Sequence, residues 1–258
     1  MSEAPRIEAR GLRLSLPARD GRLEVLGGVH LEVAPGEFVA LVGPSGCGKS
    51  TLLAVLAGLM EPEAGQVLLD GRPGADRLGH LTLMPQRDGL LPWRTLLDNV
   101  ALGPELAGAG RGDARMAARL ALARYGLAGF EDHYAHALSG GMRQRAALAR
   151  TLLGGRRAWL LDEPFGALDA LTRADVQGVL GALWAEHRPS VLLVTHDVDE
   201  ALLLADRVLV AGARPMRVHA EVAVELPRPR SDATTTTAAF GEHKRRVLDA
   251  LQATRLAA

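Results

Sequence analysis

Residues 43–50 read GPSGCGKS and match the pattern G-x-x-x-x-G-K-[ST], which is typical of loops that bind phosphate. The glycines let the backbone curl around phosphate oxygens without a Cβ in the way. The N–H groups of such a loop, with the start of a helix behind them, form a nest for anions. Lys49 can reach the β- and γ-phosphates, and the Ser50 hydroxyl suits Mg²⁺. The loop therefore predicts a site for the phosphates of a nucleotide.

Two carboxylates follow an apolar run further along the chain. Asp162 ends the run AWLLD, and Glu163 comes directly after it. A carboxylate in this place can hold Mg²⁺ directly or through water. Its neighbour is then free to orient or deprotonate an attacking water. An Asp-Glu-Pro turn alone is more often a polar strand end, but the phosphate loop upstream favours the catalytic interpretation.

Two other polar residues stand where apolar runs end. His196 follows VLLVT, and Gln86 ends LTLMPQ. Either side chain alone could simply be solvated. Ligands in open α/β sheets gather at the carboxyl ends of the strands, however, and both residues are expected there. They are candidates for the same site.

A second glycine turn lies within LSGGMRQR, residues 138–145. Ser139, Gly140 and Gly141 precede a helical segment, so their N–H groups and the helix N-terminus offer another anion site. Ordinary capping of the helix by Ser139 explains the same local pattern without any ligand. The residues alone leave both interpretations open.

The surrounding elements alternate between short Val/Leu-rich runs and longer amphipathic stretches, which predicts an α/β fold with a buried sheet. The clearest predicted strands are Phe38–Val42, Ala158–Asp162, 191–195 and Arg207–Ala211. The first forty residues instead predict antiparallel strands over 7–16 and 23–33, joined by a turn over 17–22. Residues from about 88 to 155 predict a helical subdomain. After a linker-like stretch over 227–237, a short helix is expected over 238–253.

The composition limits the classes of protein to be considered. With 258 residues, the chain is long enough for one large domain, which we place at 1–230, followed by a linker and helix over 231–258. Lys plus Arg and Asp plus Glu number 30 each, which argues against a dedicated nucleic-acid binder. No apolar run is long enough for a membrane helix, and the polar N-terminus predicts no signal peptide. The single cysteine, Cys47, excludes a disulfide framework and fits a reducing, cytoplasmic compartment.

The order of these segments resembles that of the nucleotide-binding subunit of ABC transporters. The matching segments are the phosphate loop over 43–51, the Q-loop glutamine Gln86, the signature LSGGMRQR, the Walker B segment WLLDEP, the D-loop GALD over 166–169 and the switch histidine His196. The resemblance covers about residues 7–226. It implies a P-loop NTPase fold with a RecA-like core sheet, an N-terminal antiparallel β subdomain and a helical subdomain that carries the signature.

The same resemblance implies roles for individual residues. ATP would contact Gly43, Pro44, Ser45, Gly46, Cys47, Gly48, Lys49, Ser50 and Thr51, and Mg²⁺ would be held by Ser50, Gln86 and Asp162. Glu163 would be the catalytic base, His196 would contact the γ-phosphate, and Gln86 would sense nucleotide and metal. Ser139, Gly140, Gly141 and Gln144 would face the nucleotide of a second copy, and Asp169 would communicate across this dimer. Two chains packed head-to-tail would then enclose two ATP molecules.

One position departs from the family pattern. Family members usually place an aromatic residue in the N-terminal β region, where it stacks on adenine, whereas no aromatic residue precedes Phe38 here. Leu16, or else Leu14, is expected in its place. An aliphatic side chain covers the base but lacks the stacking contribution of about 0.5–1.5 kcal/mol. Somewhat weaker or less base-selective ATP binding is expected.

A narrower resemblance comes from residues 90–103, 161–173 and 226–230. These are similar to importers of nitrate, taurine, aliphatic sulfonates and thiamine-precursor pyrimidines. That group implies an ATPase at the cytoplasmic face of the membrane, with a separate permease and a separate solute-binding protein. Trp93 and Arg94, shortly after Gln86, are candidates for contact with the permease.

Two other functions compete with import. A soluble ABC-type ATPase acting on nucleic acid or ribosomes usually carries two cassettes in tandem or a long coiled-coil insertion, and this chain has neither. A P-loop kinase or GTPase has no role for the signature or for His196. The sequence therefore favours an importer ATPase that does not bind nucleic acid.

Overall fold

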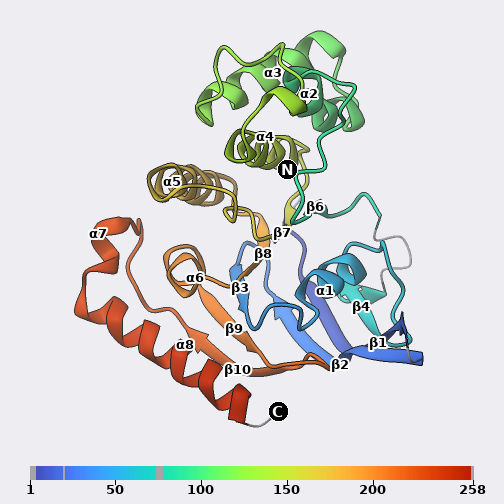
Figure 1. Cartoon of the computed structure of the whole chain (residues 1–258), viewed down its shortest axis with the longest axis vertical. Helices are drawn as coiled ribbons and strands as arrows, with labels where there is room; N and C mark the ends of the chain where they lie inside the picture. The colour runs from blue at the N-terminus through green and yellow to red at the C-terminus, as the bar shows by residue number, and fades with distance from the viewer. Residues whose placement is uncertain (1–3, 20, 74–77, 257–258) are drawn as a thin grey trace.

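The computed structural model describes residues 4–19, 21–73 and 78–256. Two β-sheets form the lower part of the molecule in Figure 1, and a lobe of helices stands above them. Helix α1 (Lys49–Leu56) packs between the sheets, where its leucines join one apolar cluster with side chains from both. This arrangement agrees with the predicted α/β class.

The larger sheet has six strands in the order β10-β9-β3-β8-β7-β6. Its strands are β3 (Phe38–Val42), β6 (Thr82–Met84), β7 (Ala158–Asp162), β8 (Ser190–Thr195), β9 (Arg207–Ala211) and β10 (Val218–Ala223). All neighbours pair in parallel except β9 and β10. Because helices or the other sheet cover both faces, β3, β7 and β8 are buried along their whole length. The four predicted strands are confirmed, and β8 begins one residue earlier than expected.

The smaller sheet is antiparallel, with the order β2-β1-β4-β5. Its strands are β1 (Ile7–Ala18), β2 (Gly21–Val33), β4 (Ala64–Leu69) and β5 (Arg72–Pro73). The predicted antiparallel pair is confirmed, but both strands extend into the predicted turn over 17–22. Asp20, within that turn, lies outside the described residues. The sequence did not predict β4 or β5.

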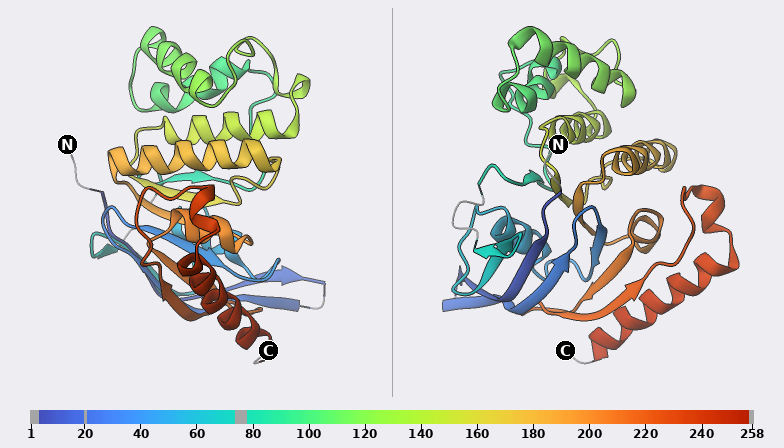
Figure 2. Two further views of the ribbon diagram at one scale, coloured as in Figure 1. Left: turned by 90° about the vertical axis from the view of Figure 1, so that its left-hand side faces the viewer. Right: turned by 180° about the vertical axis from the view of Figure 1, so that it is seen from behind.

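The helical lobe comprises α2 (Leu96–Leu106), α3 (Arg111–Arg124), the short 3₁₀ helix η1 (Ala135–Ala137) and α4 (Gly140–Leu152). Figure 2 shows it as a layer of its own beyond the six-stranded sheet. The side chain of buried Asn99 accepts a hydrogen bond from Leu91 N–H at 2.8 Å and donates to the Leu91 carbonyl at 3.1 Å. These bonds fasten the segment that leaves β6 to helix α2. The described residues from 96 to 152 are thus mainly helical, and the bounds of about 88–155 for a helical subdomain stay a prediction.

The remaining helices lie on the core. They are α5 (Ala170–His187), α6 (Val198–Leu204), α7 (Asp232–Thr235) and α8 (Ala238–Leu256). Helix α8 packs on α6, β9 and β10, with Phe240 and Val247 fully buried. The predicted C-terminal helix is present, and the linker-like stretch before it contains the one-turn helix α7. No described helix is both long enough and apolar enough to cross a membrane.

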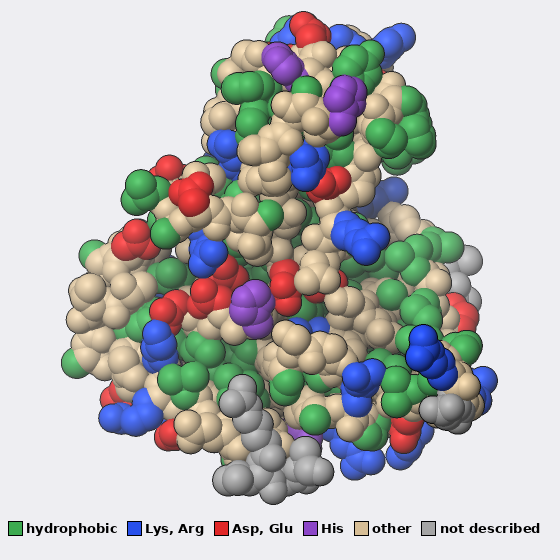
Figure 3. All heavy atoms as spheres, viewed as in Figure 1, with side chains coloured by type: hydrophobic (Ala, Val, Ile, Leu, Met, Phe, Trp, Pro, Cys, Tyr) green, Lys and Arg blue, Asp and Glu red, His purple; other side chains and the backbone are tan. Residues whose placement is uncertain are grey.

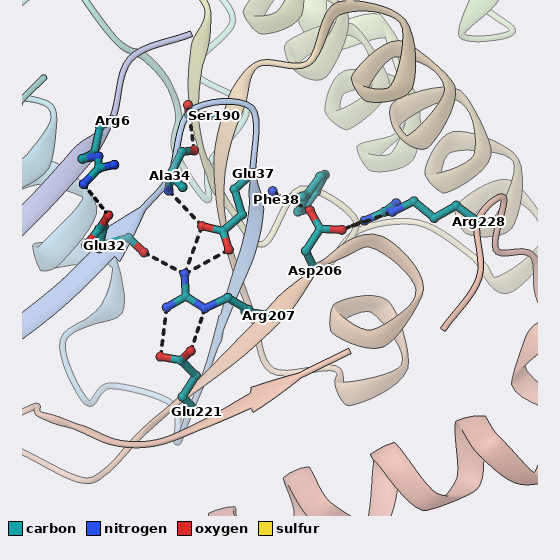
Figure 4. A network of polar contacts seen from close by, with 10 residues as sticks. All are labelled: Arg6, Glu32, Ala34, Glu37, Phe38, Ser190, Asp206, Arg207, Glu221 and Arg228. Carbon is teal, nitrogen blue, oxygen red and sulfur yellow. Dashed lines mark hydrogen bonds and ion pairs between the residues drawn. The ribbon is translucent and has the colours of Figure 1, made fainter. Parts of the chain in front are cut away.

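A polar network fastens β9 to its neighbours (Figure 4). Arg207 lies between Glu37 at 3.0 Å and Glu221 at 2.7 Å. Asp206 accepts a hydrogen bond from the N–H of Phe38 at 3.0 Å and pairs with Arg228 at 2.8 Å. The network thus holds the start of β3 against β9, and with it the strand that leads to the phosphate loop.

Candidate nucleotide site

The register of the parallel strands brings the predicted site residues to one edge of the sheet. Val42, which ends β3, pairs with Thr195, which ends β8. Asp162, which ends β7, pairs with Val194. The phosphate loop, His196 and Glu163 directly follow these strand ends, and Gln86 is the second residue after β6. On the face of the molecule seen in Figure 3, acidic side chains lie beside a histidine side chain below the helical lobe.

The phosphate loop is folded around its own lysine. Lys49 is only 5% exposed, and its Nζ donates hydrogen bonds to the carbonyls of Gly43 at 2.9 Å and Pro44 at 2.8 Å. Gly48 has a φ of 123°, and a Cβ there would lie 2.8 Å from the Val25 side chain, so the position requires glycine. No side chain caps helix α1. Its first N–H groups therefore remain available to an anion.

Asp162 lies beside this loop and is 4% exposed. Burial raises the pKa of its carboxyl group, and a hydrogen bond from the Ser50 hydroxyl and the charge of Lys49 oppose that change. The hydroxyl and carboxylate are hard oxygen donors of the kind that Mg²⁺ prefers. Cys47, in the same loop, is buried, and burial raises the pKa of its thiol.

Glu163 is the point where several predicted residues meet. Its carboxylate accepts a hydrogen bond from Gln86 Nε2 at 3.2 Å and lies 3.3 Å from His196 Nδ1. Its backbone adopts a φ of 47°, and its N–H donates to the Val194 carbonyl at 2.8 Å. Left-handed backbone at a non-glycine residue is costly and is often retained at functional sites. The structure therefore places Gln86, Glu163 and His196 together, as expected.

Gln144 has a different position from the one expected. Its side chain is 5% exposed, and its Nε2 donates to the Glu163 carbonyl at 3.2 Å in the same chain. It therefore cannot point toward a second copy in this arrangement. The spacing of the signature motif could not reveal this, because the motif shows the start of a helix but not which face of the helix is buried.

The other signature residues lie at the exposed start of α4. Ser139 caps this helix by accepting a hydrogen bond from Met142 N–H at 3.2 Å, and the first turn contains no acidic residue. Ser139 and Gly140 are exposed and Gly141 is half-buried. None of the three lines the nucleotide pocket of its own chain. The turn therefore lies at the surface of the chain, outside that pocket.

Asp169 lies at the exposed start of α5. It caps that helix through a hydrogen bond from Thr172 N–H at 3.1 Å. The hydrogen bonds from Thr172 hold the pKa of its carboxyl group below the usual value. Like the signature turn, the D-loop residue faces outward from the chain.

An open pocket of about 470 Å³ extends from the phosphate loop toward β1 and β2. Leu16, Pro17, Leu23 and Val25 form its apolar wall. Leu14 is buried in the small sheet and does not line the pocket, so of these two leucines Leu16 is the one beside it. No aromatic residue appears among the described residues that line this pocket.

Arg214 also lines this pocket, and the sequence did not identify it. It lies in the connection between β9 and β10, outside every motif. No local pattern indicates its place, because pairing between Met216 and β2 brings it there.

A second group that sequence analysis missed lies behind His196. Thr195 Oγ1 donates to buried Glu200 Oε2 at 2.6 Å and accepts from Asp197 N–H at 3.0 Å. Arg173 Nε lies 3.7 Å from Glu200 Oε1 and is joined to the D-loop through the Leu168 carbonyl, at 3.1 Å from Nη2. This group braces the backbone on both sides of the histidine.

We predict that Glu200 makes stability depend on pH. Burial raises the pKa of its carboxyl group from 4.5 to about 7. The folded state therefore binds this proton more tightly than the unfolded state does. The protonated carboxyl group contributes its full share to the free energy of unfolding below the pKa of the unfolded state, 4.5. This contribution is lost as the pH rises through the pKa of the folded state. Glu200→Gln carries no such charge, so its stability relative to wild type should rise by up to about 3 kcal/mol from acid to alkaline pH.

Denaturant unfolding of both proteins across this pH range measures the difference. Glu242→Gln, on exposed α8 surface, is the matched control and should show no such rise. A parallel pH dependence for wild type and Glu200→Gln would contradict the prediction.

Comparison with known proteins agrees with this site. A family model described as ABC transporter matches residues 26–166. The aliphatic sulfonates import ATP-binding protein SsuB 2 of Pseudomonas aeruginosa (strain UCBPP-PA14) is 48% identical over 234 residues, covering 90% of this chain and 82% of that protein. The uncharacterized ABC transporter ATP-binding protein MJ0412 of Methanocaldococcus jannaschii is 45% identical and covers 90% of this chain and 85% of that protein.

A solved structure is also similar. The dimeric post-hydrolysis state of the ATP-binding cassette MJ0796, bound to ADP and Pi, has 28% sequence identity and a TM-score of 0.78. The match covers 86% of this chain and all of that chain. With its site geometry, the family match and these relatives in agreement, the chain belongs to the ABC transporter family as an ATP-binding subunit.

Proposed function

We propose that this chain is the ATP-hydrolysing subunit of an importer and drives the uptake of a small solute through a separate permease. The main support is that the carboxylate of Glu163 contacts both Gln86 and His196 beside the phosphate loop. Relatives named as import ATP-binding proteins favour transport over the nucleic-acid alternative.

Hydrolysis needs a group that prepares water beside the γ-phosphate. Glu163 is suited to accept the proton of this water, because its carboxylate is held on two sides at the end of β7. His196 is exposed at the adjacent strand end and can donate to a phosphate oxygen. Lys49 and the N–H groups of the loop stabilise negative charge on the phosphates.

Mg²⁺ fits this site as the partner of the nucleotide. Ser50 and Asp162 already share a hydrogen bond and would hold the ion, with Gln86 close by. The ion would neutralise phosphate charge as the γ-phosphate leaves. The residues 43–51 would hold ATP in the manner that the family resemblance implies.

Two copies would combine to complete each nucleotide site. Ser139 and Gly140 are exposed at a helix start, Gly141 is half-buried, and none of the three lines the pocket of its own chain. A head-to-tail homodimer would set this turn against the γ-phosphate bound to the partner's Lys49 loop. Asp169 would communicate across the same interface.

The permease is expected to dock beside the Q-loop. Trp93 is 72% exposed and lines, with Arg94 and Tyr134, a pocket of about 550 Å³ on the helical lobe. Large exposed aromatic side chains are common anchors in protein interfaces. Asn99 ties this surface to the segment that follows Gln86, so permease motion there can reach the catalytic carboxylate.

The transported solute would be nitrate, taurine, an aliphatic sulfonate or a related small molecule, delivered by a separate solute-binding protein. Support comes from the relatives named for aliphatic sulfonates. The chain would then be peripheral at the cytoplasmic face of the membrane.

Two variants test the assignment of the ATPase site. Lys49→Ala removes charge compensation for the phosphates and should lose both ATP binding and hydrolysis. Glu163→Gln keeps the phosphate loop intact, so it should bind ATP but hydrolyse it at least about 100-fold more slowly. Phosphate release and ATP binding by calorimetry measure these effects. Turnover equal to wild type in either variant would refute the assigned role.

The dimer can be trapped when hydrolysis is blocked. With ATP and Mg²⁺, Glu163→Gln should elute as a dimer in gel filtration, because both ATP molecules remain bound between the chains. Adding Ser139→Arg, which places bulk and charge at the exposed turn, should return it to a monomer that still binds ATP. A monomer in both cases would contradict the proposed interface.

The docking surface can be tested by co-purification of a cognate permease that is co-expressed with this chain. Trp93→Ala should reduce the amount of permease retained, because it removes an exposed aromatic anchor, while ATP hydrolysis by the isolated chain stays unchanged. Leu171→Ala, which alters an exposed apolar residue on α5, is the matched control. Equal retention by both variants would place the docking surface elsewhere.

A further inference from the structure

The connection between β9 and β10 is fastened to the nucleotide side of the molecule. Met216 N–H donates to the Val25 carbonyl at 2.8 Å, and Gly27 N–H donates to the Met216 carbonyl at 3.0 Å. Val25 belongs to the apolar wall of the nucleotide pocket. These two hydrogen bonds therefore hold Arg214, two residues before Met216, at the edge of that pocket.

The side chain of Arg214 approaches the phosphate loop. A Cβ built on Gly46 would lie 4.0 Å from Arg214 Nη2. The positive charge of Arg214 also acts on the thiol of Cys47, the next residue of the loop. The guanidinium group is thus directed at the segment whose N–H groups form the phosphate nest.

The exposed side chain of Arg214 makes no hydrogen bond or ion pair with any residue in the described part of the chain. The ammonium group of Lys49, by contrast, already donates to two carbonyl groups of the loop. Among the described residues that line the pocket, these two are the only ones with a permanent positive charge. Arg214 is therefore the cation that a bound anion can engage without breaking an existing contact.

We propose that Arg214 is a second cationic ligand for the phosphate chain of the nucleotide, a role that rests on the proposed ATPase function. Guanidinium groups bind phosphate through two parallel N–H···O bonds, with a planar geometry that lysine does not reproduce. The groups that Arg214 approaches belong to Gly46 and Cys47 of the phosphate loop, which favours the phosphates over the base. The apolar wall, from Leu16 to Val25, is left to cover the base.

This contact makes the affinity depend on phosphate charge rather than on the identity of the base. It adds a charge-assisted interaction at a site that lacks an aromatic platform. Screening by salt weakens an exposed ion pair of this kind. ATP and GTP should lose affinity to the same degree when Arg214 is replaced.

The experiment compares Arg214→Gln, Arg214→Lys and the control Arg217→Gln in the full-length chain. Arg217 is exposed in the same connection but does not line the pocket. Calorimetry with ATP, ADP, GTP and adenosine, at low and high salt, gives the dissociation constants. Thermal unfolding verifies that each variant is folded.

Arg214→Gln should weaken ATP, ADP and GTP binding about tenfold, as expected for a hydrogen-bonded charged group, and should leave adenosine binding unchanged. Arg214→Lys should recover only part of the loss, and Arg217→Gln should resemble wild type. The wild-type affinity should fall more steeply with salt than that of Arg214→Gln.

Three results would overturn the inference. The first is equal nucleotide affinity for Arg214→Gln and Arg217→Gln. The second is an equal loss of affinity for adenosine and ATP in Arg214→Gln, which would place Arg214 on the base. The third is full recovery of ATP affinity in Arg214→Lys. Lys49→Ala separates this inference from the proposed function. If wild type binds ATP and Lys49→Ala does not, the site stands even where Arg214 has no effect. If wild type binds no nucleotide, the proposed function itself fails.

Discussion

The parallel pairing of β3, β8, β7 and β6 is the constraint on which the site depends. β3, β7 and β8 are buried throughout, and successive side chains point to opposite faces. A slip of one residue would exchange the faces that pack against the two apolar clusters, so the register is strongly specified. The same register pairs Val42 with Thr195, so the two strands end at the same edge of the sheet. The packing of apolar side chains thus sets the positions of the phosphate loop and His196.

The helical lobe reaches this rigid edge through few polar contacts. Gln144 from α4 bonds the backbone of Glu163, and Gln86 from the segment entering the lobe bonds its side chain. Both are single hydrogen bonds at 3.2 Å on a residue with left-handed backbone. A rotation of the lobe would therefore reposition the carboxylate of Glu163 more readily than it would move β7. Helix α4 carries both Gln144 and the signature turn in its N-terminal half, so in the proposed dimer one rigid element would link a partner's nucleotide to Glu163.

The sequence predicted the parts whose cause is local. Strands β3, β7 and β9 have the predicted bounds because continuous apolar runs end at turns, and the phosphate loop follows a known spacing. Strands β4, β5 and β10 were missed because they are short or half exposed and carry no such run. The inward position of Gln144, the Thr195–Glu200 contact and the approach of Arg214 were missed for another reason. Each depends on packing between segments that are distant in sequence, which no spacing rule contains.

The two ends of the nucleotide pocket differ in how strongly they can discriminate between ligands. Leu16 and Val25 offer dispersion and exclusion of water, which any flat base can use, and they supply no aromatic stacking. The other end is formed by the N-terminus of helix α1, which no side chain caps, by buried Lys49 and by the exposed Arg214. Those groups would act on charge, and they would distinguish a triphosphate from a nucleoside but not one base from another. Because hydrolysis changes only the phosphate end, a site that concentrates its binding there would be sensitive to the reaction itself, and it would gain little from a tighter hold on the base.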